Sequence, residues 1–183
     1  MIALIAVAAG LLFGALGGGS PRGLATVRLR FQISILVLFV IQGVARGRLL
    51  STVASGSGMF VWVAASTILV VLLRASFRQT GVMVVAAGVL LNVLVVLANS
   101  GMPVLAGGSS QLLAKGAVAR SSGFYEVATS STLGLVVGDV IPLEVVGQTY
   151  YLSVGDVLLG VGVAVAIAAA MIGEGQSSAE DAG

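Results

Sequence analysis

The side chains that could carry out chemistry in this chain are few. It contains no His and no Cys, which excludes His-based general catalysis, thiol chemistry and Cys/His zinc sites. The single lysine, Lys115, lies outside the apolar stretches, and no serine stands at a spacing that favours a Ser–Lys dyad. We therefore expect no catalytic residue, no metal site and no cofactor, and we favour a protein that is not an enzyme.

Two carboxylates, Asp139 and Asp156, stand in the same tetrapeptide, Val-Gly-Asp-Val. A pair of carboxylates can bind a divalent cation together with carbonyl groups and water. Gly-Asp pairs also suit turns and helix ends. Ser153, three residues before Asp156, predicts a capping box in which each side chain bonds the backbone N–H of the other. We favour this structural interpretation and keep the cation site as an alternative.

Uncharged polar side chains also interrupt the apolar stretches, at Gln42 and Asn92, and Asn99 ends the stretch that contains Asn92. Such amides either bond across a helix bundle or line a path for a solute. No charged residue lies in the middle of an apolar stretch, which argues against a proton-coupled pump. The candidate residues for a ligand site or a polar cap are Gln42, Asn92, Asn99, Asp139 and Asp156.

The composition of the chain predicts that membrane-embedded elements position these residues. Of the 183 residues, 58% are hydrophobic and only 9% are charged, and 26 are glycine. A soluble domain of this size has about 25% charged residues to cover its surface. We therefore expect the lipid bilayer as the main partner. The net charge of +2 comes without a basic stripe, so no nucleic acid is expected.

Five apolar stretches are candidates to cross a bilayer, which takes about 20 residues. The second lies between Arg30 and Arg46 and would span about 22 Å as a helix, so it could instead be re-entrant or interfacial. The first has no basic residue before it, unlike a secretory signal, and we expect it to be retained. The predicted spans are 2–18, 31–45, 60–73, 81–99 and 154–172.

The segment 100–152 is predicted as a long loop. Loops of this length are commonly functional or structured. Its apolar part, 132–141, is too short to span and could lie at the interface, dip into the membrane or cover the bundle. Residues 1–173 form one predicted transmembrane domain, and 174–183 a flexible polar tail. The expected fold is an all-α integral membrane protein, a bundle of five transmembrane helices with a long structured loop between helices 4 and 5.

Small residues recur every fourth position in the first and fifth spans. Because lipid provides no hydrophobic drive between helices, smooth stripes of this kind favour close helix contact. The contact could lie within one chain or between chains, through self-association or with other membrane subunits. The predicted helix-packing residues are Gly10, Gly14, Gly18, Gly160, Ala164 and Ala168.

Orientation depends on a small difference in basic residues between the two sides. The loops at 19–30 and 74–80 share a side with the C-terminus and hold five arginines, against four basic residues on the other side. The positive-inside rule then places the C-terminus in the cytoplasm and the N-terminus outside. The expected location is the plasma membrane of a bacterium, crossed several times.

Three motifs in order resemble a family of bacterial multi-pass membrane proteins known as domain of unknown function 5317. They are GVLLNVLVVLANSGMPV at 88–104, LGLVVGDVIP at 133–142 and LSVGDVLL at 152–159, and Gln42 also suits the pattern. The resemblance implies an integral membrane protein and carries over no activity. It draws attention to residues that could form one polar cap: Asn92, Asn99, Met102, Pro103, Asp139, Pro142 and Asp156.

Two functions follow as expectations. The first is a non-catalytic accessory or scaffold subunit that packs in a membrane complex or a homo-oligomer, because packing stripes are present and catalytic side chains are missing. The alternative is a small transporter or ligand-binding membrane protein, with a polar site where helix 4, the long loop and helix 5 meet. A membrane enzyme acting on a lipid or prenyl substrate is the third and weakest interpretation.

Overall fold

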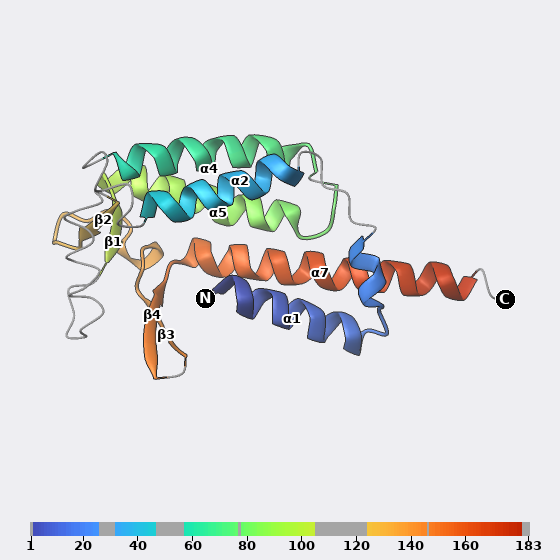
Figure 1. Ribbon diagram of the computed structural model, residues 1–183. Helices are drawn as coiled ribbons and strands as arrows, with labels where there is room; N and C mark the ends of the chain where they lie inside the picture. Colours follow the sequence, from blue (N-terminus) through green and yellow to red (C-terminus); the bar gives the residue numbers. More distant parts are fainter. Residues whose placement is uncertain are drawn as a thin grey trace.

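The computed structural model describes residues 2–25, 32–46, 57–76, 78–104, 124–145 and 147–180, with the backbone alone at Gln32, Arg46, Gln148 and 174–180. Within these ranges the chain is mostly helical (Figure 1). The long helices are α1 (Ile2–Leu16), α2 (Gln32–Arg46), α4 (Gly58–Arg74), α5 (Val82–Asn99) and α7 (Val154–Glu180). Two short 3-10 helices, η1 (Pro21–Ala25) and η2 (Leu135–Val137), lie between them. Lys115 and the rest of 105–123 fall outside the described residues.

The helices pack in the order α1, α7, α5, α4 and α2, so α7 lies between α1 and α5 (Figure 1). α1 and α7 run in the same direction, because Gly10 lies against Ile167 and Gly14 against Met171. α5 runs in the opposite direction to α7 (Figure 1). The helices therefore alternate in direction along the chain, and the two ends of the bundle hold different connections.

Two apolar clusters hold α4 and α5 to their neighbours. In the first, Leu69 of α4 is fully buried between Ile35 of α2 and Val89 of α5. The second lies at the other end of these helices, where Trp62 is buried and its ring meets Phe124 edge to face at 5.1 Å between centroids. This second cluster attaches the segment after α5 to the helices.

Short strands occupy part of the segment that the sequence predicted as a loop, so the fold is mostly helical rather than all-α. β1 (Met102–Val104) pairs in parallel with β2 (Tyr125–Val127), and β3 (Ile141–Val145) pairs antiparallel with β4 (Gln148–Leu152). The turn of the second pair contains Gly147 at φ +71°, a left-handed conformation that glycine adopts readily. Side chains of β3 alternate between half-buried and exposed, as in a strand with one covered face.

Each of the five predicted spans overlaps one long helix, but the lengths differ. Only α5 and the first 20 residues of α7, Val154–Gly173, are long and apolar enough to cross a membrane by length and composition, among the residues described. α1, α2 and α4 are apolar but shorter. α7 also continues to Glu180, into the predicted flexible tail, because each further residue adds a helical hydrogen bond without an interrupting proline.

Most of the predicted packing stripe lies between α1 and α7. A Cβ at Gly10 would lie 2.8 Å from the Ala164 carbonyl oxygen, and one at Gly14 would lie 2.6 Å from the Met171 sulfur. Gly160 approaches α1 at Ile2. Ala164 and Ala168 line an apolar cavity of about 430 Å³ between the same two helices. The small residues therefore let α1 and α7 approach closely.

Gly18 is an exception, because it takes no part in the contact between α1 and α7. It is the second residue after the end of α1 and has φ +76°, and a Cβ there would meet nothing within 4 Å. Its N–H bonds the Ala15 carbonyl at 3.0 Å, and the Gly19 N–H bonds that of Gly14 at 2.9 Å. This pair of bonds is a Schellman motif, so Gly18 ends the helix by its left-handed backbone.

Candidate functional site

Asn92 and Asp156 meet where α5 crosses the start of α7. Asn92 lies in the interior of α5 and is 2% exposed. Its Nδ2 donates to Oδ1 of Asp156, in the first turn of α7, at 2.9 Å. The two residues are 64 positions apart in the chain. The structure thus brings together two of the candidate polar residues, one from each side of the long connecting segment.

Ser153 completes this junction. Its hydroxyl donates to Oδ1 of Asn92 at 2.8 Å and accepts from the backbone N–H of Asp156 at 2.9 Å. Oδ2 of Asp156 in turn accepts a long bond, 3.5 Å, from the backbone N–H of Ser153. The predicted capping box is confirmed. Asn92 extends the capping box by bonding the side chains of both Ser153 and Asp156, and the sequence did not predict these two bonds. We call Asn92, Ser153 and Asp156 the capping junction.

Two glycines permit the close approach that the capping junction needs. A Cβ at Gly88 would lie 2.5 Å from the Gly155 carbonyl oxygen, and one at Gly155 would overlap the Asn92 side chain. α7 approaches α5 closely again two turns after Gly155, where a Cβ at Gly162 would lie 2.6 Å from the Val85 backbone nitrogen. None of these glycines was among the predicted packing residues. The available signal was the seven-residue spacing, which places Gly155 and Gly162 on one helix face.

Asn99 lies two turns beyond Asn92, at the end of α5, and holds a different segment. Its Nδ2 donates to the carbonyls of Val95 and Leu133, both at 2.9 Å, and its Oδ1 accepts from the Leu133 N–H at 2.8 Å. Both functional groups of the amide are therefore used. Asn99 attaches the chain before η2 to the end of α5, which is a structural task.

Asp139 lies next to β1. Its backbone N–H donates to the Pro103 carbonyl at 3.0 Å, and it forms an isolated bridge with Val104. The residue is 6% exposed. Met102 and Pro103, which the resemblance also highlighted, belong to this strand and are buried, whereas Pro142 is exposed on β3. The proposed polar cap is therefore divided between the capping junction and the β1 region.

Gln42 lies apart from both places, on α2, which packs on α4. It is 8% exposed, and its Nε2 has no hydrogen-bond partner among the residues that the structure describes. Ser66 of α4 is fully buried, and its Oγ likewise has none within that part of the chain. Gln42 is therefore not part of the capping junction.

The chemistry available at the capping junction is limited. The Ser153 hydroxyl both donates and accepts, and each Asp156 oxygen accepts a bond, so their polar atoms are engaged within the fold. Among the described residues no group of three or more Asp or Glu side chains could hold a metal ion. The three residues line neither of the two cavities described here. The arrangement is suited to connecting two helices.

Fold and site together define a mostly helical protein with two helices able to span a membrane, joined at a buried helix cap. Residues 24–168 match the family of unknown function DUF5317. The chain belongs to this family, as its three motifs predicted. The match includes α2, α4, α5 and the capping junction, and α1 precedes it. No curated protein and no solved structure matches the chain.

Proposed function

We propose that this protein is an integral membrane protein whose five long helices all cross the bilayer. The observation that carries the proposal is the large apolar side chains on the outer faces of the helices. Leu16 of α1 is 74% exposed, Ile33 of α2 is 80% exposed and Phe60 of α4 is 69% exposed. Soluble monomers rarely expose apolar patches beyond a few hundred Å². Lipid tails cover such faces without cost.

The short helices are compatible with this arrangement. With 15 residues each, α1 and α2 measure about 22 Å, against a hydrocarbon core of about 30 Å. Local thinning of the bilayer and snorkelling of flanking side chains accommodate such a mismatch at modest cost. Arg74, exposed in the last turn of α4, is placed for snorkelling. The alternating helix directions support five successive crossings.

For the location we propose the plasma membrane of a bacterium, with the N-terminus outside and the C-terminus in the cytoplasm. The described turn between α4 and α5, with Arg78, then faces the cytoplasm. This agrees with the tendency of short cytoplasmic loops to carry Arg and Lys. A protease-accessible tag after Gly183 tests the orientation. Cleavage of that tag in intact cells would contradict it.

For the role we propose a non-catalytic accessory or scaffold subunit that packs in a membrane complex or homo-oligomer. The capping junction supports this role because its polar side chains bond one another and leave no open polar path at that point. The open apolar groove between α1 and α7 supplies a contact surface, in which exposed Phe13 lies beside the small residues Ala164 and Ala168. Small residues of this kind favour close helix–helix contact in membranes.

The test is purification of the full chain from its native membrane in a mild detergent, followed by mass spectrometry of what remains bound. Before that, extraction of the membranes at alkaline pH should leave the protein in the pellet. We expect a homo-oligomer or a stoichiometric membrane partner. Replacing Ala168 by Phe should reduce that association, while Gly43→Ala on α2 should not. Release by alkali contradicts membrane integration, and a lone monomer contradicts the scaffold role.

A further inference from the structure

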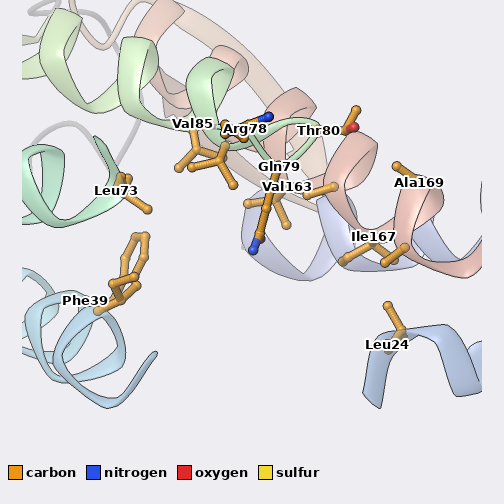
Figure 2. A pocket seen from close by; sticks show the side chains of 14 residues that line it. Leu24, Phe39, Leu73, Arg78, Gln79, Thr80, Val85, Val163, Ile167 and Ala169 are labelled. Carbon is orange, nitrogen blue, oxygen red and sulfur yellow. The ribbon is translucent and has the colours of Figure 1, made fainter. Parts of the chain in front are cut away.

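The larger of the two cavities described here lies at the end of the bundle opposite the capping junction and has an amphipathic lining. Its volume is about 610 Å³, and it opens between α2, the start of α5, α7 and η1 (Figure 2). Most of its wall is apolar. Figure 2 shows Phe39 and Leu73 on one side and Ile167 and Leu24 on the other.

The polar part of the lining is confined to the turn between α4 and α5. Arg78, Gln79 and Thr80 are consecutive, and Arg78 and Thr80 lie at one edge of the hollow (Figure 2). Arg78 and Thr80 are exposed, whereas Gln79 is half-buried and its side chain extends into the hollow (Figure 2). A cationic rim above an apolar groove is complementary to an anionic amphiphile.

The charges that the structure describes are separated along the bundle. The arginine side chains among the described residues, Arg22, Arg74 and Arg78, are at the cavity end. The described carboxylates are on β2, on β3, beside β1 and in the first turn of α7, towards the other end (Figure 1). No described carboxylate lines the cavity. Arg78 is thus the one charged side chain among the described residues that line the cavity, and its positive charge favours an anion there.

We propose that this cavity binds one anionic phospholipid. Its phosphate lies at Arg78, with Thr80 as a second donor, and one acyl chain lies along Phe39, Leu73, Val163 and Ile167. Arginine suits this task because its planar guanidinium donates two parallel bonds to a phosphate. Basic pockets between membrane helices on the cytoplasmic side commonly bind such headgroups. The inference rests on the membrane location proposed above and goes beyond the scaffold role.

The experiment measures lipid retained by the purified full chain in native mass spectrometry. The probes are phosphatidylglycerol and phosphatidylcholine with identical acyl chains, added separately to delipidated protein. We expect one phosphatidylglycerol per chain, retained about tenfold better than phosphatidylcholine, since charge-assisted bonds are the stronger ones. Equal retention of the two lipids by the wild type would overturn the proposal.

Three variants identify the contact. Arg78→Gln should remove the preference for phosphatidylglycerol, while Arg74→Gln, an exposed arginine outside the lining, should keep it. Ala169→Phe should reduce retention of both lipids by filling the groove. Helical circular dichroism checks that each variant is folded. An unchanged preference for phosphatidylglycerol in Arg78→Gln would refute Arg78 as the headgroup contact. Displacement of the lipid by inorganic phosphate alone would refute the binding of an acyl chain in the groove.

The lipid result and the scaffold result are read separately in the same spectrum. Oligomeric state and protein partners appear as protein masses, and bound lipid appears as a defined mass added to them. A monomer with one phosphatidylglycerol contradicts the scaffold role and supports this inference. An oligomer without lipid does the reverse.

Discussion

Replacing Gly88 by Ala tests the close approach of α5 and α7. The new Cβ would lie 2.5 Å from the Gly155 carbonyl oxygen and 2.7 Å from the Leu159 backbone nitrogen. Both atoms belong to helical backbone and cannot rotate away, so the helices must separate. Overpacking of this kind costs about 1–3 kcal/mol, and the better helix propensity of Ala returns about 1 kcal/mol. We expect a net loss of up to about 2 kcal/mol in the free energy of unfolding.

The assay is unfolding in mixed micelles by titration with a denaturing detergent, followed by circular dichroism. The matched control is Gly43→Ala on α2, where an added Cβ meets nothing within 4 Å. That variant should be more stable than the wild type by roughly 0.5–1 kcal/mol, because Ala loses less backbone entropy than Gly in a helix. If Gly88→Ala is as stable as Gly43→Ala, the close contact of α5 with α7 is wrong.

Three further predictions concern the polar residues and the hairpin. Asn92→Ala and Asp156→Ala should each destabilise the fold, and their double-mutant cycle in the same assay should give a coupling of about 1 kcal/mol, whereas additive effects would contradict the direct bond. Asn99→Ala should accelerate amide hydrogen exchange at Leu133 with little change in global unfolding. An unchanged rate there would contradict the attachment. Gly147→Ala should cost roughly 1–2 kcal/mol locally because of its positive φ. It should speed exchange in β3 and β4 while the helical dichroism stays constant, and protected strands would show that the turn tolerates Ala.

Local composition was enough to locate the helices. A charge-free apolar stretch is visible in the sequence alone, and each of the five predicted ranges overlaps a helix. The β3–β4 hairpin was missed, although two short runs separated by two residues including Gly147 are typical of one. Within β3, Pro142 obscures the strand because proline cannot donate to a ladder. The parallel pair of β1 and β2, in contrast, joins three-residue strands that lie far apart in the chain, so it can be recognised only from tertiary contacts.

The candidate polar residues are buried or hydrogen-bonded in the structure, but their partners could not be predicted from the sequence. Asn92 bonds Asp156 because α5 lies against α7, and Gln42 is elsewhere because α2 lies against α4. The order of helices in a bundle depends on the fit of whole faces, here set partly by Gly88 and Gly155. The spacing of residues within one helix does not predict the order in which the helices pack.

The position of the capping junction explains why polar residues occur in so apolar a bundle. Asn92 lies seven residues before the end of α5, so α7 begins about 10 Å along α5 from that end. The first N–H groups of α7, which have no partner inside their own helix, therefore point among packed helices. If the helices cross the bilayer as proposed, water is scarce there, and each unsatisfied group costs several kcal/mol. Ser153 and Asp156 satisfy the cap, and Asn92 satisfies their remaining polar atoms. The buried start of α7 is thus enough to explain the polar residues of the capping junction, and a solute-binding role is not needed to explain them.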